Sequence, residues 1–128
     1  MTRYLTAEEV LQLHEFLIGD FGGLEGIRDR NGLESAVARL QTGYYGDVIE
    51  EAAALFESLS QNHPFVDGNK RTGFVVGILF MELNGYQFTA SQEDAAQAVL
   101  ELASGKLDEA AYAAFLRSNS FRGRNKRS

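Results

Sequence analysis

The chain has 128 residues, enough for one domain with its own core, and its 45% hydrophobic and 23% charged content is ordinary for a globular protein. It contains no cysteine, which excludes disulfides and thiolate metal sites, and its formal net charge of −6 argues against general nucleic-acid binding. Basic residues gather after the last acid, Glu109: Arg117, Arg122, Arg124, Lys126 and Arg127. We therefore predict a single domain over residues 1–120 and a flexible basic tail over 121–128.

Helical patterns then follow one another along the chain. Thr6 and Glu9 form a capping box, and the string Asn31-Gly32-Leu33-Glu34 predicts a second one. Ser91 and Asp108 are expected to cap two later helices. The glycines and tyrosines of residues 41–48 interrupt the pattern and predict a short hairpin or flap. The expected helices span residues 7–18, 33–40, 49–62, 68–83, 92–103 and 109–117.

The predicted helix over residues 68–83 is apolar on nearly all sides, from Phe74 to Leu83. A helix of that kind is normally surrounded by other elements in the centre of a domain. The predicted fold is therefore all-α, a compact helical bundle around a buried central helix. The longest apolar run, Phe74 to Met81, is far too short to cross a bilayer. The N-terminal residues lack the apolar segment of a secretion signal, so we expect a cytoplasmic protein.

The loop before the central helix carries the residues best suited to chemistry. Its sequence is His63-Pro64-Phe65-Val66-Asp67-Gly68-Asn69-Lys70-Arg71. A histidine titrates near neutral pH, so His63 is the candidate general base. The carboxylate of Asp67 is a hard oxygen ligand suited to magnesium. We interpret Phe65 as an apolar anchor that holds the loop in the core.

The start of the central helix is predicted to bind an anion. Gly68 lets the backbone approach a ligand, and the first turn offers unpaired N–H groups at the positive end of the helix dipole. Lys70 and Arg71 add positive charge where the dipole would normally favour acids, a conflict that a bound polyanion would resolve. The purely structural alternative is a tight helix–loop–helix turn, in which His63 caps one helix and Asp67 is the N-cap of the next.

The whole string from His63 to Arg71 resembles the signature loop of the Fic/Doc superfamily. The upstream strings Gly26-Ile27-Arg28-Asp29 and Gly32-Leu33-Glu34-Ser35-Ala36 are similar to the Doc, or death-on-curing, branch, as is Leu83-Asn84-Gly85-Tyr86. The resemblance covers roughly residues 4–118. It implies a Fic/Doc-type helical fold that binds ATP and Mg²⁺. His63 would be the base, Asp67 the metal ligand, and Gly68, Asn69, Lys70 and Arg71 the phosphate cradle.

One departure from the AMP-transferring Fic enzymes favours the Doc branch. Those enzymes usually carry a second arginine three positions after the first, where this chain has Phe74. The resemblance therefore implies a toxin that transfers the γ-phosphate of ATP to a hydroxyl of a translation factor, elongation factor Tu in the known cases. Two alternatives remain open: an AMP or other nucleotidyl transferase, and a mainly non-catalytic co-regulator of its own operon.

The resemblance also implies partners and further site residues. The nearest string to a self-inhibitory Fic helix, Thr89 to Glu93, lacks the last position of that motif, so a separate antitoxin is expected. Contact with nucleic acid would be indirect, through the antitoxin. Tyr44 and Tyr45 lie where the family has its target-docking flap. We interpret Arg28 and Asp29 as a structural ion pair, and His14 as a packed or surface residue outside the site.

Overall fold

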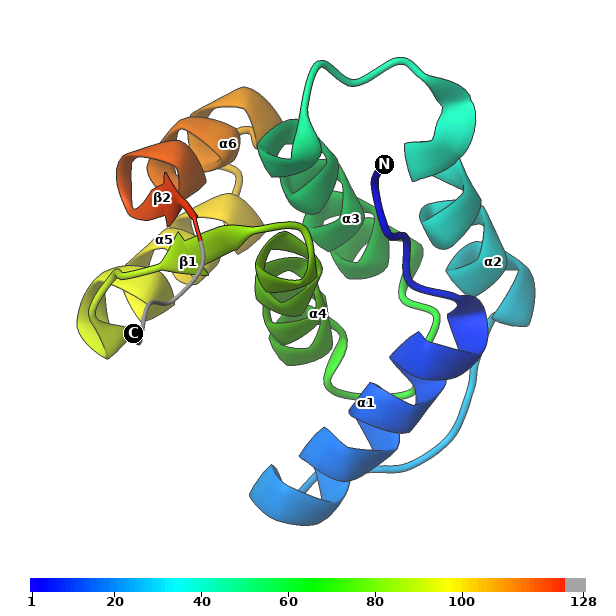
Figure 1. The fold of residues 1–128 in the computed structure, drawn as a ribbon. Helices are drawn as coiled ribbons and strands as arrows, with labels where there is room; N and C mark the ends of the chain where they lie inside the picture. Colours follow the sequence, from blue (N-terminus) through cyan, green and yellow to red (C-terminus); the bar gives the residue numbers. More distant parts are fainter. Residues whose placement is uncertain (124–128) are drawn as a thin grey trace.

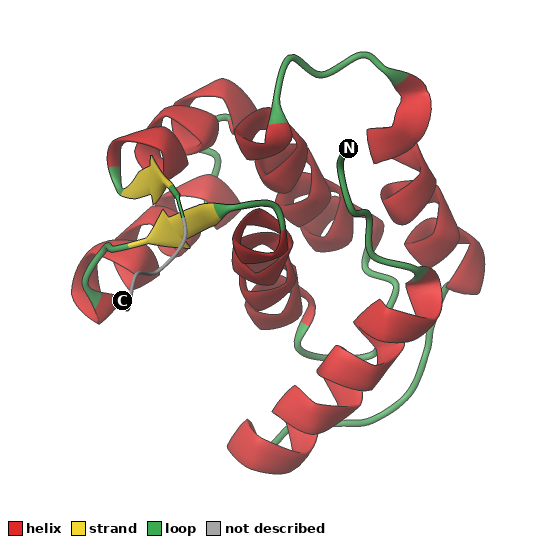
Figure 2. Cartoon of the chain, viewed as in Figure 1, coloured by secondary structure: helices red, strands yellow, loops and turns green. Residues whose placement is uncertain are grey.

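The computed structural model describes residues 1–123 and shows a helical bundle with one small two-stranded sheet (Figures 1 and 2). The predicted all-α class is therefore confirmed. The helices are α1 (Ala7–Phe21), α2 (Arg30–Arg39), the 3₁₀ helix η1 (Leu40–Thr42), α3 (Val48–Asn62), α4 (Asn69–Leu83), α5 (Gln92–Ala103) and α6 (Glu109–Ser118). The strands are β1 (Tyr86–Phe88) and β2 (Ser120–Arg122).

Side-chain caps explain where most of these helices begin. Thr6 accepts a hydrogen bond from the Glu9 amide while the Glu9 carboxylate accepts one from the Thr6 amide, which confirms the predicted capping box of α1. Ser91 and Asp108 cap α5 and α6, also as predicted. Asp47 caps α3 in the same way. Each cap satisfies an amide that the first turn of a helix leaves without a partner.

The prediction for the start of α2 was wrong. Asp29, not Asn31, is the N-cap, and its carboxylate accepts a hydrogen bond from the Gly32 amide at 2.9 Å. The helix therefore starts at Arg30, three residues earlier than predicted, and Asp29 has a capping role. No Arg28–Asp29 ion pair forms among the residues that the structure describes, so that interpretation was wrong as well.

Helices α3 and α4 form the centre of the bundle, and the other helices surround them (Figure 1). The central placement of the apolar helix is thus confirmed. The two axes approach closely at Gly73, where a Cβ atom would lie only 2.8 Å from Cδ1 of Phe56. Phe56 and Leu59 of α3 and Phe80 of α4 are essentially inaccessible to solvent. Burial of these side chains, with the other apolar residues of the core, stabilises the packing of the two helices against each other.

The segment 41–48 does not form the predicted hairpin. It consists of the end of η1 and a series of bends, with Gly43 in a left-handed conformation after the 3₁₀ turn. The residues of this segment pair with no strand, so the alternation of glycine and tyrosine marks a turn rather than a hairpin.

A short antiparallel sheet joins the middle of the chain to its end. Tyr86 pairs with Arg122 and Phe88 with Ser120. The first two residues of the predicted tail therefore lie in β2, while residues 124–128 fall outside the described residues. Within the described chain, no helix is both long enough and apolar enough to cross a membrane.

Candidate active site

The loop between α3 and α4 opens into a pocket of about 410 Å³. Its walls come from the end of α1, the loop itself and the first turn of α4. The residues lining it are Phe21, Gly22, His63, Val66, Asp67, Gly68, Asn69, Lys70 and Arg71. The structure therefore places His63, Asp67 and the four predicted phosphate-cradle residues around one cavity.

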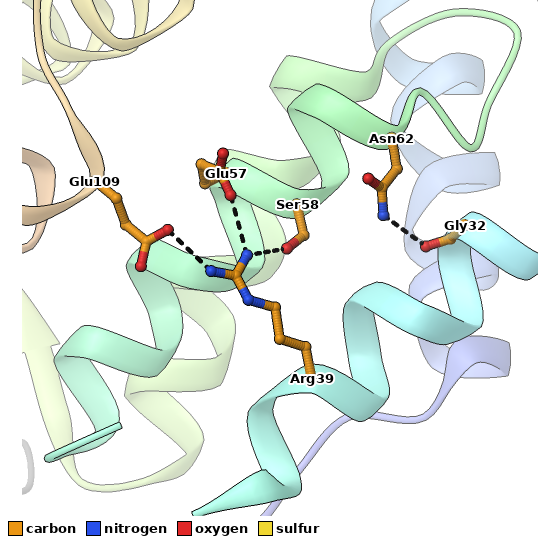
Figure 3. Close-up of polar contacts among 6 residues, drawn as sticks. All are labelled: Gly32, Arg39, Glu57, Ser58, Asn62 and Glu109. Atoms are coloured by element: carbon orange, nitrogen blue, oxygen red, sulfur yellow. Dashed lines mark hydrogen bonds and ion pairs between the residues drawn. The ribbon is translucent and has the colours of Figure 1, made fainter. Parts of the chain in front are cut away.

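His63 ends α3 in a strained backbone conformation. Its φ of +48° and ψ of +55° lie in the left-handed region, where it is the only non-glycine residue in the described chain with positive φ. Such a conformation costs free energy and is often found at functional sites. The preceding residue, Asn62, donates a hydrogen bond to the Gly32 carbonyl of α2, which fixes the last turn of α3 (Figure 3). The exposed imidazole lines the pocket.

Asp67 is held by backbone amides on both carboxylate oxygens. Oδ2 accepts a hydrogen bond from the Leu24 amide at 3.0 Å, and Oδ1 accepts one from the Gly68 amide at 2.9 Å. A side chain at Gly23 would collide with the carboxylate, because its Cβ would lie 2.8 Å from Oδ2. Gly68, not Asp67, is the N-cap of α4, so the structural alternative for Asp67 does not apply.

Asp67 fits the role of a magnesium ligand. Each of its oxygens accepts a single amide and so keeps lone pairs for a cation. The described residues contain no group of three or more acidic or histidine side chains that could hold a metal ion by themselves. Magnesium is commonly bound by one or two carboxylates together with substrate phosphates and water, and one aspartate beside a phosphate site suits that mode.

The first turn of α4 combines free amides with two cations. The first backbone bond of the helix is donated by Thr72 to the Gly68 carbonyl, so the amides of Asn69, Lys70 and Arg71 have no helical partner. Lys70 and Arg71 are exposed, and neither forms an ion pair with any described residue. Their charge is therefore available to an anion in the pocket.

The Asn69 side chain has a different role from the predicted one. Its Oδ1 accepts a hydrogen bond from the Phe65 amide at 3.0 Å, and its Nδ2 donates to the Phe65 carbonyl at 2.9 Å. Both polar atoms of the amide are thus used to hold the loop on the helix. Asn69 can offer its backbone N–H to a phosphate, while its side chain fixes the loop.

His14 is a packed residue, one of the two predicted alternatives, and it supports the loop without lining the pocket. It is 2% exposed, its ring stacks on Phe65 with centroids 3.8 Å apart, and its Nε2 lies 2.8 Å from the Asp67 carbonyl oxygen. A carbonyl only accepts hydrogen bonds, so Nε2 carries the proton. Phe65 is fully buried, which confirms its role as an anchor. His14 lies 53 positions from Asp67, and only its place on the buried face of α1 could have indicated this contact.

The segment before α2 runs alongside the loop between α3 and α4. Ile27 forms an antiparallel bridge with Phe65, the Val66 amide donates to the Gly26 carbonyl, and the Arg28 amide donates to the Pro64 carbonyl. These backbone bonds hold the loop against the segment that precedes α2. The Gly26–Asp29 string therefore has a structural role, which is to bind the backbone of the loop.

Tyr44 and Tyr45 are not brought to the His63 pocket. They lie before the first residue of α3, whereas His63 follows its last, and 15 helical residues span about 22 Å. Both line a separate cavity with Glu109 and Arg117, which shares no residue with the His63 pocket. The predicted docking role therefore gains no support from proximity to His63.

Phe74 is likewise absent from the pocket lining. Its ring meets that of Phe88 edge-on, with centroids 6.0 Å apart, and it packs at the edge of the core. An apolar ring in that place can give no hydrogen bond to a phosphate. The described site thus has one arginine, Arg71, in the pocket wall.

Comparison with known proteins places this site in a family. Residues 4–81 match the Fic/DOC family. The chain belongs to the Fic/DOC family. Toxin Doc of Mycolicibacterium smegmatis is 42% identical over 95 residues, which cover 70% of this chain and 71% of that protein. Protein kinase doc of Escherichia phage P1 is 31% identical over 119 residues, which cover 90% of this chain and 94% of that protein.

The region matched to the family contains the whole pocket lining. It runs from before α1 to residue 81 in the last turn of α4 and so includes every lining residue, from Phe21 to Arg71. The two relatives support a Doc-like toxin function and a transferase activity for the chain. The group transferred and the acceptor have to be argued from the site itself.

Proposed function

We propose that this protein is a Doc-like toxin that transfers the γ-phosphate of ATP to a hydroxyl group of a translation factor, with elongation factor Tu as the expected acceptor. The observation that carries the proposal is the grouping of His63, Asp67, Lys70 and Arg71 around one pocket at the start of α4. Phosphoryl transfer needs exactly these functions: a proton acceptor, a metal ligand and positive donors for the phosphates.

The chemical step can be written with each group in a stated role. The imidazole of His63 accepts the proton of the attacking hydroxyl. A bond forms between the hydroxyl oxygen and the γ-phosphorus, the bond from that phosphorus to the β–γ bridging oxygen breaks, and ADP leaves. The free amides of the α4 first turn, with Lys70 and Arg71, hold the phosphates. Magnesium on Asp67 would neutralise charge on the phosphates.

Transfer of phosphate is favoured over transfer of AMP by the composition of the pocket wall. Arg71 supplies the guanidinium of the site, and Phe74, where AMP-transferring relatives usually carry a second one, packs against Phe88 instead. A second guanidinium for the terminal phosphates is thus missing from the described site, whose other cation is Lys70. The toxin names of the relatives further lead us to propose a cognate antitoxin as the partner protein.

The test compares two labelled forms of ATP. Purified protein is incubated with elongation factor Tu, or with a cell extract, and with ATP labelled either at the γ- or at the α-phosphate. We expect the acceptor to take the γ-label alone and to gain the mass of one phosphate. The His63→Ala variant should fold normally and transfer neither label. Transfer of the α-label would instead show an AMP transferase and overturn the proposal.

A further inference from the structure

Phe21 is an exposed aromatic residue at the mouth of the pocket. It is the last residue of α1, its ring is 61% exposed, and it belongs to the pocket lining. The hydrophobic core does not include it. Packing in the core therefore does not explain the position of Phe21. Its ring instead contacts a residue of the predicted phosphate cradle.

That contact is with Arg71. The guanidinium carbon of Arg71 lies over the ring of Phe21, 5.1 Å from its centroid. A cation over the face of an aromatic ring is attracted by the negative potential of that face. The ring offers no conventional acceptor, so the N–H groups of the guanidinium stay available to a ligand.

Arg71 differs in this respect from four other arginines of the described chain, whereas Arg122 also lies over a ring, that of Tyr86. Arg3, Arg30, Arg39 and Arg117 each form an ion pair with a carboxylate. Among the described residues Arg71 has no such partner, and the ring of Phe21 takes the place of an acid. A carboxylate there would compete with an incoming phosphate for the guanidinium, whereas a ring holds the cation in place without neutralising it.

We infer that Phe21 is a positioning residue for phosphate recognition: its ring holds the Arg71 guanidinium at the pocket wall, where the polyphosphate chain of the nucleotide binds. The inference rests on the proposed function, because it assumes that the pocket takes a nucleotide polyphosphate. A long arginine side chain that is already ordered loses less conformational freedom on binding. Phe21 therefore acts through Arg71 on the phosphates and not through stacking on the base.

The test uses the full chain and two probes, ATP and inorganic tripolyphosphate, each with magnesium and each titrated by calorimetry. Phe21→Leu removes the ring, and Phe21→Tyr restores it. Phe16→Leu is the matched control, since Phe16 is an equally exposed phenylalanine of α1 that does not line the pocket. We expect Phe21→Leu to weaken binding of both probes about 3- to 10-fold. Phe21→Tyr and Phe16→Leu should bind like the parent.

A double-mutant cycle separates positioning from a general structural effect. In an Arg71→Gln background, Phe21→Leu should cause no further loss of affinity, because the group that it positions is gone. In the transfer reaction, Phe21→Leu should raise KM for ATP while kcat changes little. An equal loss in the Arg71→Gln background would show that Phe21 acts structurally, and would overturn the inference. Weaker ATP binding with unchanged tripolyphosphate binding would also overturn it, in favour of base stacking.

Failure of the proposed function can be recognised separately. If the parent binds both probes and the cycle gives the expected coupling while the α-label is transferred, the role of Phe21 stands and only the proposed reaction is wrong. If the γ-label is transferred while the cycle shows no coupling, the proposed function stands and the role of Phe21 is wrong. A parent protein that binds neither probe would contradict both.

Discussion

At the scale of single residues, the two histidines of the chain have different roles at the site: His63 is exposed in the pocket, and His14 supports the loop from behind. His63 is exposed and strained at the end of α3, where its imidazole can meet a substrate. His14 is buried behind the loop and bonds its backbone. The proposed reaction uses the exposed ring of His63, whereas the shape of the loop depends on the buried ring of His14.

The strained backbone at His63 predicts that the stability of a variant depends on how easily its new residue adopts positive φ. His63→Ala and His63→Gly should both abolish transfer, because each removes the base. Glycine adopts the left-handed conformation freely whereas alanine does not, so the glycine variant should be more stable than the alanine variant by about 1 kcal/mol. Chemical denaturation of the two variants gives the comparison. Equal stability would mean that the loop relaxes once the imidazole is removed.

His14 should matter for both folding and ligand binding. His14→Leu leaves the Asp67 carbonyl without its donor and removes the stack on Phe65, which we expect to cost about 1–3 kcal/mol. Affinity for magnesium-ATP should fall with it, because the loop that carries Asp67 loses a support. His14→Gln can keep a donor and should recover part of both losses. Unchanged unfolding and unchanged affinity in His14→Leu would contradict this role.

Glu51 predicts a pH-dependent stability. It is a buried residue of α3 that accepts a hydrogen bond from the Tyr4 hydroxyl at 2.8 Å. Burial raises the pKa of Glu51, the charge of Asp47 raises it further, and the Tyr4 hydrogen bond offsets only part of this rise. The unfolded chain therefore loses the Glu51 proton at lower pH than the folded chain, so stability is lost as pH rises through this range.

Glu51→Gln should accordingly raise the melting temperature at pH 7.5 and change it less at pH 4, where most of the carboxyl groups are protonated in both states. Its neutral amide keeps an oxygen that can accept from Tyr4. Glu15→Gln, on the exposed face of α1, is the control and should show no such difference between the two pH values. A gain of equal size at both pH values would show that titration of Glu51 is not the cause.

At the scale of elements, the contact between α3 and α4 decides whether the loop between them keeps its shape. Gly73→Ala would place a methyl group against Phe56 and Leu59, with the nearest atom 2.8 Å away, and should cost about 1–3 kcal/mol. Gly19→Ala on α1 meets no atom within 4 Å and should stabilise the protein by about 0.5–1 kcal/mol. Urea denaturation of both variants tests the pair, and a neutral Gly73→Ala would show that the helices can move apart.

The sequence predicted those elements whose signals are local. Thr6, Ser91 and Asp108 cap the helices that they were expected to cap, because a cap and its amide lie within three residues of each other. At α2 the predicted cap was Asn31, and backbone bonds from the 26–29 segment to Pro64 decided in favour of Asp29. That decision depends on a residue more than thirty positions away.

For the site, too, the sequence predicted the residues that are close together along the chain and missed those brought in by long-range packing. His63, Asp67, Lys70 and Arg71 are close in sequence, and they line one pocket. His14 and Phe21 reach the site only because α1 packs against α4. In the same way, β1 and β2 pair although more than thirty residues separate them. Such contacts are fixed by packing of the whole chain, which a local pattern does not record.

At the scale of the whole molecule, one arginine connects three helices. Arg39 at the end of α2 donates hydrogen bonds to Glu57 and Ser58 of α3 and to Glu109 of α6 (Figure 3). Its guanidinium also lies over the ring of Tyr45. The part of the molecule around α6 is thereby tied to the C-terminal half of α3, the half that ends at His63. Arg39 is partly shielded from solvent, so these bonds are screened less than those of a fully exposed pair.

Arg39→Met should therefore lower the stability of the whole domain by about 1 kcal/mol while leaving nucleotide affinity unchanged, because the network lies outside the pocket. Arg30→Met is the matched control: Arg30 also bonds two carboxylates, Glu8 and Glu34, but in an exposed position, so its loss should matter much less. Denaturation at low and at high salt gives the comparison, and the Arg39 effect should persist in salt. An Arg39 variant as stable as the Arg30 variant would mean that packing of α3 against α6 holds these helices together without the network.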